Sequence, residues 1–399
     1  MKIGIDATCW RNNRGFGRFT REILTALFQL DSSHDYYLFT DQPLSELDNT
    51  PNVEVVLVKT SRPTTEAAVA DSNRSPIDML RMSRAVSRYT LDLFFFPAVY
   101  SWFPVSRRFP IMLTVMDAIA EHYPKLIFPG WRSRILWTLK IRGAIWASDR
   151  ILTISNAAKK EIIEYIGVDA DVIDVTSCAP NPQFHVIRDK DLIRGAKVRA
   201  KLPPDVPFIV FVGGLAPHKN LHGLLDGFER ALSQGRVPNL HFALVGDFSG
   251  AGFFSNYDSL YDRVQGSSML RDRVHFSGFM PDEDLVAIYS SALAAAMPSY
   301  SEGFGLPAVE AMACGAPVLS SDRGSLPEVV GDAGLYFDPF DIESISEALI
   351  EMVENTRLRE KLAGSALTRA GQFTWERAAR LTLQHLEGMY EREIFGTRL

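Results

Sequence analysis

Short apolar runs alternate with amphipathic helical stretches along almost the whole chain of 399 residues. The runs have the length of buried strands, and the stretches between them repeat their apolar residues with a helical period. Lys2–Asp6, Phe208–Val212 and Ala294–Met297 are clear examples of such runs. Because strands and helices alternate in this way, the sequence predicts an α/β architecture with parallel sheets.

The length favours two domains rather than a single core. We place the first domain at 1–185 and the second at 205–372, and we interpret the proline- and charge-rich Ser177–Asp205 as the connection. Each domain is expected to be a Rossmann-like parallel sheet. Such sheets bind ligands beyond the carboxyl ends of their strands, so a cleft between the two domains is the expected site.

The composition narrows the class of protein. Hydrophobic residues make up 46% of the chain and the formal net charge is -6, which gives no reason to expect nucleic-acid binding. Three distant cysteines argue against a disulfide framework or a zinc cluster and fit a reducing compartment. The chain starts directly in a strand pattern without a signal-peptide layout, and its apolar runs are too short to span a membrane. We therefore expect a cytoplasmic protein.

The most specific motif is SEGFGLPAVEAMACGAPVLSSDRGSLPE, residues 301–328. Glu302 lies in the loop before a predicted helix, and Glu310 lies about one turn inside that helix. Gly303 and Gly305 lead into a helix N-terminus, whose free N–H groups can bind an anion such as phosphate. Carboxylates beside it can accept hydrogen bonds from sugar or ribose hydroxyls. The segment therefore predicts a nucleotide-sugar site.

A second loop, VGGLAPHKN, follows another predicted strand. Lys219 and Asn220 precede a helix there, so Lys219 can meet a diphosphate together with the helix dipole. A solvated lysine near a turn explains the loop alone equally well. The segment 301–328 favours the binding interpretation.

Two sequence features are expected to lie at the carboxyl edge of the first sheet. Gly15 and Gly17 are expected in a loop before the first helix, where a simple turn is the competing interpretation. Thr20 occupies the place of the third glycine of the dinucleotide fingerprint, which disfavours a nicotinamide-dependent dehydrogenase. Asp117 follows a buried strand and either faces the cleft or caps the next helix, and propensity favours the cap.

Two D-x-D strings, at residues 169–171 and 282–284, resemble the metal-binding pattern of some transferases. The first lies in a predicted turn and the second at a predicted helix start, where carboxylates stabilise the helix dipole. We therefore interpret both as structural, and we expect neither a metal nor another cofactor.

The predicted helix at 131–142 carries four basic residues, two tryptophans and no acidic residue. A basic amphipathic helix with tryptophan can lie on an anionic membrane surface. An ordinary helix with a solvated face is the alternative that we favour.

The order of these segments resembles the retaining glycosyltransferases of family 4, which have the GT-B fold of two Rossmann-like domains facing a central cleft. The resemblance covers nearly the whole chain and includes GIDATCWRNNRGFGRFTREIL, TVMDAIAEHYP, ASDRILTISNAAKKEII and VHFSGFMPDEDLVAIYSSA. FTWERAARLTLQHLE, at 373–387, is similar to the family's closing segment. A helix over 375–399 is therefore expected to pack back on the first domain.

The resemblance also implies roles for single residues. It places Glu302 beside the donor sugar, Glu310 on the nucleotide ribose and Lys219 on the donor diphosphate. Together with Asp117 of the first domain, Glu302 and Lys219 are the expected catalytic residues. The other expected substrate-binding residues are those of the glycine-bearing loops: Gly15, Gly17, Gly214, Asn220, Gly278, Phe279, Gly303, Phe304, Gly305 and Leu306.

The sequence departs from the family at two positions. Met116 stands where many members carry a histidine, and a methionine can neither bind a sugar hydroxyl strongly nor take a proton. His122 is the nearby candidate to compensate, although we expect it at the surface. Gly214 stands where many members have arginine, which leaves Lys219 as the main cation of that loop.

We therefore predict a retaining, metal-independent glycosyltransferase that moves a hexose from a nucleotide diphosphate sugar to a glycan or lipid-linked acceptor. Mannose from GDP-mannose is the expected donor, with UDP-linked glucose or N-acetylglucosamine as alternatives. A catalytically silent GT-B partner subunit, which Met116 favours, and a nucleotide-sugar epimerase are the competing functions. The expected location is the cytoplasm, with a peripheral contact at the inner face of the membrane through 131–142.

Overall fold

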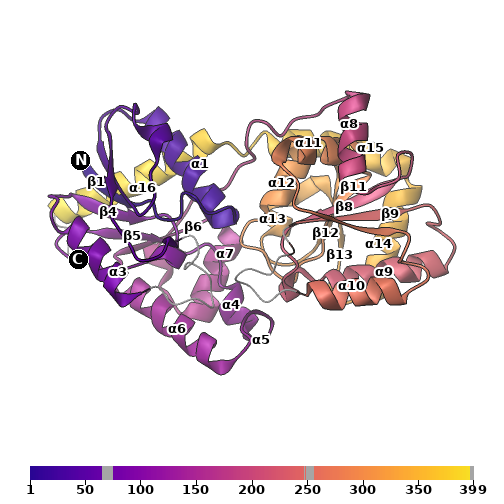
Figure 1. Cartoon of the computed structure of the whole chain (residues 1–399), viewed down its shortest axis with the longest axis horizontal. Helices are drawn as coiled ribbons and strands as arrows, with labels where there is room; N and C mark the ends of the chain where they lie inside the picture. Colours follow the sequence, from indigo (N-terminus) through magenta and orange to yellow (C-terminus); the bar gives the residue numbers. More distant parts are fainter. Residues whose placement is uncertain (65–74, 247, 249–255, 396–399) are drawn as a thin grey trace. The chain divides into compact units, whose positions relative to one another are not determined.

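The computed structural model describes residues 1–64, 75–246, 248 and 256–395. The chain divides into two compact units. The first comprises Met1–Pro124, Phe128–Cys178 and Trp375–Leu399, and the second comprises Lys125–Ile127 and Ala179–Thr374. Each unit is a parallel sheet with helices on both faces (Figure 1). Within the described ranges, no helix is both long and apolar enough to cross a membrane.

The first sheet has seven strands in the order β3-β2-β1-β4-β5-β6-β7. Their bounds are β1 Lys2–Asp6, β2 Asp35–Thr40, β3 Val53–Leu57, β4 Leu93–Phe96, β5 Ile111–Thr114, β6 Arg150–Thr153 and β7 Ile173–Val175. All neighbouring strands are parallel. Because β1 pairs with both β2 and β4, the strand order reverses between β1 and β4. Parallel sheets bind their ligands beside such a reversal.

Helices cover both faces of this sheet (Figure 1). Their bounds are α1 Gly15–Leu30, α3 Pro76–Val86, α4 Ile119–His122, α5 Pro124–Ile127, α6 Trp131–Trp146, α7 Asn156–Glu161 and α16 Trp375–Phe395. A π-helical turn, Ile162–Ile166, extends α7. Helices α1 and α16 pack against each other on one face. On the other face, α3 and α6 cover an aromatic core that includes Phe94, Phe96 and Trp137.

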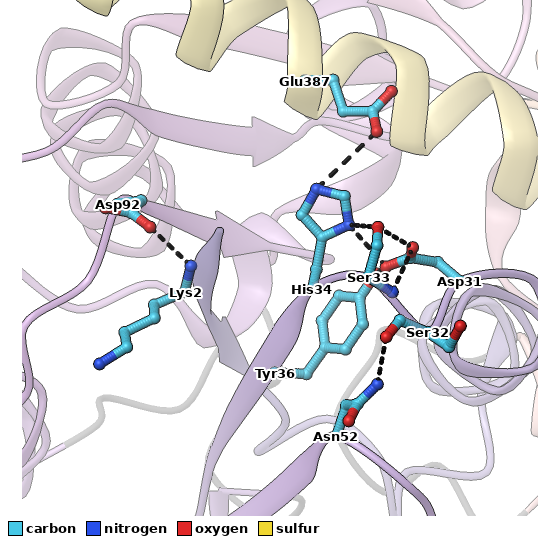
Figure 2. A network of polar contacts seen from close by, with 9 residues as sticks. All are labelled: Lys2, Asp31, Ser32, Ser33, His34, Tyr36, Asn52, Asp92 and Glu387. Atoms are coloured by element: carbon cyan, nitrogen blue, oxygen red, sulfur yellow. Dashed lines mark hydrogen bonds and ion pairs between the residues drawn. The ribbon is translucent and has the colours of Figure 1, made fainter.

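A buried polar network connects α16 to the turn between α1 and β2 (Figure 2). The Tyr36 hydroxyl donates to Asp31 at 2.6 Å, and His34 Nδ1 lies 2.7 Å from the same carboxylate. His34 Nε2 lies 3.8 Å from Glu387 of α16. Burial acts to raise the pKa of Asp31, but the hydrogen bonds from Tyr36, Ser33 and His34 outweigh it and lower this pKa to about 2. This network lies at the amino edge of the sheet, away from the loops that follow the strands.

The second sheet has six parallel strands in the order β10-β9-β8-β11-β12-β13. Their bounds are β8 Phe208–Val212, β9 His241–Val245, β10 Val274–Gly278, β11 Ala294–Met297, β12 Val318–Ser321 and β13 Gly334–Phe337. Strand β8 pairs with β9 on one side and β11 on the other, so the order reverses between β8 and β11. The second unit therefore has its own switch point, at the loops after these two strands.

The helices of the second unit pack on this sheet around a core that includes Phe228 and Phe242. Their bounds are α8 Lys190–Arg199, α9 Leu221–Ser233, α10 Tyr257–Gly266, α11 Asp282–Ser291, α12 Leu306–Ala313, α13 Leu326–Val330, α14 Ile342–Glu354 and α15 Thr356–Ala370. A 3-10 turn, Pro217–Lys219, precedes α9. The elements α10, α13, α15 and β13 were not predicted from the sequence.

The segment Ser177–Asp205, which we interpreted as the connection between the domains, contains helix α8, which was not predicted from the sequence. The Asp189 carboxylate caps this helix by accepting hydrogen bonds from the backbone N–H groups of Asp191 and Leu192. An ion pair between Arg199 and Asp284 fastens the helix to α11. Only Ala196 of α8 is fully buried, so the apolar period that reveals a helix is almost missing from its sequence.

Candidate functional site

The loops after β8 and β11 meet at the switch point of the second sheet. The backbone N–H of Tyr300, in the loop after β11, donates to the carbonyl of His218 in the loop after β8, at 2.9 Å. Both loops were singled out by sequence, and the topology places them side by side because β8 and β11 are neighbours. The edge they form is where a parallel sheet of this order binds a ligand.

Lys219 and Glu302, the two charged residues expected there, form an ion pair. The Lys219 Nζ lies 2.6 and 2.7 Å from the two oxygens of the Glu302 carboxylate. The Ser299 hydroxyl donates to the same carboxylate at 2.6 Å. Glu302 is only 7% exposed, whereas the Lys219 side chain keeps 21% of its surface. The Lys219 side chain is therefore partly exposed, whereas the carboxylate that it pairs with is buried.

The charge of Lys219 lowers the pKa values of two neighbouring groups. Burial acts to raise the pKa of Glu302, but the charge of Lys219 and the hydrogen bonds from Lys219 and Ser299 outweigh it, so the pKa is lowered. Burial, followed by the positive charge of Lys219, lowers the pKa of the neighbouring His218 to about 3. At neutral pH Glu302 is therefore a carboxylate and His218 a neutral imidazole. Sequence reasoning missed His218, although it directly precedes Lys219.

A left-handed glycine joins this loop to α12. Gly305 has a φ of 87°, and a Cβ added to it would lie 2.8 Å from Leu326 Cδ2, so the position requires glycine. Helix α12 then begins at Leu306, with proline in its first turn as predicted. Phe304 is 4% exposed and its ring packs edge-on against Phe373. Its side chain is thus a core group, and only its backbone and that of the buried Gly303 can serve a ligand.

The loop after β12 contacts the backbone of Glu302. Gly324 has a φ of 59°, and an added Cβ would lie 2.8 Å from the backbone nitrogen of Glu302. The next residue, Ser325, donates its N–H to the Glu302 carbonyl at 3.2 Å. These two residues were not predicted as part of the site. The glycine within the DRG string of the predicted motif is the signal that could have identified them.

Glu310 lies one turn inside α12 and is 3% exposed. Burial, and then the charge of Glu310, raise the pKa of the Cys314 thiol to about 12. The structure therefore places Glu310 on the helix that starts directly after the Glu302 loop, as the motif predicted, and it places Cys314 nearby as an inert thiol.

Glycines also end the strands on the other side of the switch point. The Gly246 N–H donates to the Gly278 carbonyl at 3.0 Å, and a Cβ on Gly246 would lie 2.0 Å from the carbonyl oxygen of Gly213. Gly246 was not predicted, although it follows a strand as the other two do. Gly214 faces open space, and Phe279 is 74% exposed beside the left-handed Gly278. This half of the edge therefore leaves room above the strand ends.

Asn220 has a structural contact in this loop. It adopts the left-handed conformation, with a φ of 52°, and is 4% exposed. Its side-chain amide donates to the carbonyl of Pro339 at 2.8 Å, which ties the β8 loop to the loop after β13. Asn220 was expected to bind substrate, and in this structure its amide is directed to the protein instead.

In the first unit, the prediction that Gly15 and Gly17 lie in a loop is wrong, because α1 begins at Gly15. A Cβ on Gly17 would lie 2.1 Å from the carbonyl oxygen of Asn12. The first turn of α1 therefore packs against the preceding segment so closely that only glycine fits. Gly15 faces open space at the helix N-terminus.

Asp117 follows β5 and accepts a hydrogen bond from the N–H of Ile119 at 3.2 Å, so it serves the start of α4 as propensity suggested. Its negative charge affects the pKa values of two neighbouring side chains. Burial, then Asp117 and Glu121, raise the pKa of Tyr100, and Asp117 also contributes to a raised pKa of Glu121 after burial. Asp117 thus lies in a polar cluster at the carboxyl edge of the first sheet.

Met116 is buried, at 8% exposure. His122 was expected at the surface, but its ring is stacked between Tyr123 and Tyr165, with centroid distances of 3.9 and 4.1 Å. Burial lowers the pKa of His122, so it is neutral at pH 7. The histidine is therefore held in an aromatic stack and does not occupy the place of Met116.

The two D-x-D strings have structural contacts. The Asp169 carboxylate accepts from the N–H of Asp171, and the Asp282 carboxylate accepts from Gln183 at 2.6 Å. Asp284 is the partner of Arg199. In the part of the chain that the structure describes, no group of three or more His, Cys, Asp or Glu side chains is placed to hold a metal ion.

A family model and several known proteins match part of this chain. Residues 195–368 match the family model "Glycosyl transferases group 1". The chain is similar to O-antigen chain mannosyltransferase B of Escherichia coli, with 33% identity over 58% of this chain and 59% of that protein. It is also similar to the serotype-specific mannosyltransferase WbdA of E. coli, with 30% identity over 59% of this chain but only 28% of that protein.

The fold matches solved structures over nearly the whole chain. The crystal structure of Anabaena Alr3699/HepE in complex with UDP-glucose superposes with a TM-score of 0.72. The match covers 97% of this chain and 100% of that one at 18% sequence identity, which shows a shared GT-B fold of two Rossmann-like domains. We conclude that the second unit of this chain resembles the glycosyl transferases group 1, whose family model it matches, and that the whole chain shares the fold of the solved structures.

Proposed function

We propose that this chain is a retaining, metal-independent hexosyltransferase whose donor is a nucleotide diphosphate sugar. The observation that carries the proposal is the ion pair of Lys219 and Glu302 at the switch point of the second sheet. The partly exposed Lys219 is the cation that would meet the diphosphate. The buried carboxylate behind it can accept hydrogen bonds from the hydroxyls of the transferred sugar.

The same residues account for the chemistry. When the bond between the sugar anomeric carbon and the phosphate oxygen breaks, negative charge develops on the leaving diphosphate. Lys219 and the dipole of α12, whose N-terminus follows the Glu302 loop, stabilise that charge. In a front-face reaction the acceptor oxygen bonds to the same face of the anomeric carbon. Its proton passes to the departing phosphate oxygen, so configuration is retained without a separate base.

The proposed donor sugar is mannose, from GDP-mannose. Two relatives from E. coli are named mannosyltransferases, but the chain spans only 59% and 28% of their lengths. UDP-glucose is the second candidate, because a structure with the same fold was determined with that compound. Phe279 and the open space above Gly214 lie where a base and a ribose can be accommodated on this edge.

The proposed acceptor is a hydroxyl of a glycan or of a lipid-linked sugar, bound on the side of the first unit where Asp117 lies. The proposed location is the cytoplasm, at the inner face of the membrane when α6 makes a peripheral contact. Three widely separated cysteines in 399 residues fit a reducing compartment.

Donor binding and donor hydrolysis test the proposal together. Thermal shift with GDP-mannose, UDP-glucose and UDP-N-acetylglucosamine should raise the melting midpoint for one of them, since a ligand stabilises the state that binds it. Released nucleotide should then be abolished in Glu302→Gln, which keeps the size of the side chain. Unchanged hydrolysis in this variant would contradict the assigned role of Glu302.

The competing function is a silent GT-B partner that binds a nucleotide sugar without transferring it. Met116, which replaces a proton-accepting side chain, is the observation that favours it. Tight donor binding with neither hydrolysis nor transfer in any acceptor screen would support this alternative against our proposal.

A further inference from the structure

The first unit contains a cavity of about 150 Å³ beside α6. Helices α4 and α6 and the π-helical turn Ile162–Ile166 supply its walls. A π-helical turn widens a helix locally and is often found at functional sites. The polar and aromatic side chains on the wall are Glu121, Arg134, Trp137, Thr138, Arg142 and Tyr165. The cavity is large enough for a small polar group with a ring or a few methylenes.

Two arginines with no ion-pair partner among the described residues border this cavity. Arg134 and Arg142 lie about two turns apart on α6 with Thr138 between them, and both side chains are exposed. By contrast, Arg150 at the start of β6 is paired with Asp174. Two arginines that line one cavity and have no ion-pair partner among the described residues favour an anionic ligand, because a phosphate can accept hydrogen bonds from a guanidinium group.

Glu121, the carboxyl residue of the wall, is hydrogen-bonded to an indole and forms no ion pair with either arginine in the described part of the chain. Glu121 accepts a hydrogen bond from the Trp137 indole at 2.7 Å. Burial, followed by the charge of Asp117, raises the pKa of Glu121 and so favours its uncharged form. The influence of Asp117 also shows that the cavity lies next to the polar cluster at the carboxyl edge of the first sheet.

An exposed apolar stripe runs along α6 beside the cavity. Trp131, Ile135, Leu139 and Trp146 are 69%, 49%, 65% and 74% exposed. Their spacing of four and seven residues places them on one side of the helix, and Arg142 falls within the same stripe. A single amphiphilic ligand can therefore contact the stripe and the cavity together.

We infer that α6 and this cavity bind a lipid-linked acceptor through its phosphate group. The phosphate lies between Arg134 and Arg142, and the lipid chain lies along the stripe from Trp131 to Trp146. A purely sugar acceptor gives no reason for the exposed apolar stripe, and an uncharged lipid gives none for the unpaired arginines. The inference rests on the proposed function and identifies the chemical class of its acceptor.

The test uses three soluble probes with the full chain. Decyl phosphate carries both the phosphate and the chain, inorganic phosphate carries the charge alone, and decyl glucoside carries the chain with a neutral head. Isothermal titration below micelle formation should give a clear dissociation constant for decyl phosphate and weaker binding for the other two. Equal binding of inorganic phosphate would show a free-phosphate site and overturn the lipid part of the inference.

Arginine variants separate a specific site from diffuse charge. The double substitution R134Q/R142Q should weaken decyl phosphate binding by roughly tenfold or more, because charge-assisted hydrogen bonds to the phosphate are lost. R108Q removes the same charge from an exposed residue of the same unit, outside both the cavity wall and the stripe, so it should change binding by less than about twofold. Equal effects of R108Q and the double variant would overturn the cavity site and leave only a charged surface.

Filling the cavity gives an independent test. Thr138→Trp adds volume at the middle of the wall and should abolish decyl phosphate binding while the melting midpoint stays close to that of the wild type. Retained binding in this variant would overturn the inference. Donor binding to the second unit is measured in the same proteins and should be unchanged, so a failure here is distinguishable from a failure of the proposed donor site.

Discussion

The carboxyl edges of the two sheets differ in how their polar groups are arranged. At the second sheet, short loops are hydrogen-bonded to one another, and the central charges of Lys219 and Glu302 are paired and largely buried. At the first sheet, Asp117 lies in a polar cluster with Tyr100 and Glu121. Nearby, Arg134 and Arg142 border a cavity without ion-pair partners among the described residues. We interpret the edge of the second sheet as a preorganised donor site. We interpret the edge of the first sheet as a site that is completed when its acceptor binds.

The largest expected effect comes from the charged pair. Glu302→Gln and Lys219→Met should each lower sugar transfer by roughly 100-fold or more, because each removes a group aimed at the developing charge or the transferred sugar. Asp117→Asn, the matched change at the other edge, keeps the acceptor oxygen for the Ile119 N–H and should cost less. Steady-state rates with saturating donor check this order. A larger loss in Asp117→Asn would reverse the comparison.

Backbone geometry offers a second contrast. Gly324→Ala should destabilise the protein by about 2 kcal/mol or more, since the new Cβ meets the Glu302 backbone and the φ of 59° disfavours alanine. Gly214→Ala is the control, because its added Cβ meets open space. Urea or thermal unfolding of both variants measures the difference. Equal stability of the two would show that the Glu302 loop is not held as tightly as the structure indicates.

The free energy of unfolding should depend on pH through one histidine at each edge. The pKa of His218 is lowered to about 3 in the folded state, so between pH 6.5 and pH 3 the unfolded chain binds a proton there that the folded chain does not. Stability is therefore lost as the pH falls through this window, by an order of 1–3 kcal/mol, and His218→Asn should remove that loss. His122→Asn should also reduce the loss of stability at low pH, since burial also lowers the pKa of His122 in the folded state.

Unfolding midpoints at pH 7 and pH 4.5 for the wild type and both variants provide the measurement. An acid-induced loss in His218→Asn as large as that of the wild type would contradict the buried, neutral state of His218. It would also weaken the interpretation of the second sheet's edge as a preorganised site.

The smallest effect is expected at Met116. Met116→Leu conserves side-chain volume and should change stability by less than about 1.5 kcal/mol. Transfer should remain near the wild-type rate if the thioether only fills space at the first edge. Loss of most activity in this variant, with folding intact, would assign Met116 a direct part in the reaction.

The sequence predicted which two loops meet at the switch point of the second sheet because the information there is local. The motif around Glu302 and the loop with Lys219 each contain their own glycines, charges and helix start, and parallel pairing of β8 with β11 brings them together. The strands were recognisable because buried strands such as β4 and β11 are continuous apolar runs. Two-domain α/β architecture followed from the same pattern.

The remaining features depend on contacts between distant segments. Gly324 and Gly246 matter because another backbone passes within reach of a Cβ, and no local pattern shows that approach. Helix α8 is polar and is held by the Arg199–Asp284 ion pair and an Asp189 cap, so its apolar period was too weak to predict. The cavity beside α6 needs α4 and the π-helical turn next to it, which a helix-by-helix prediction cannot provide.

The most direct measurement of the central claim is the affinity of the second unit's edge for a nucleoside diphosphate. Isothermal titration of GDP and UDP into the wild type and Lys219→Met should show micromolar binding of one nucleotide and roughly tenfold or weaker binding in the variant, because the lysine charge on the diphosphate is lost. Identical dissociation constants for the two proteins would contradict the assignment of the Lys219–Glu302 pair as the donor diphosphate site.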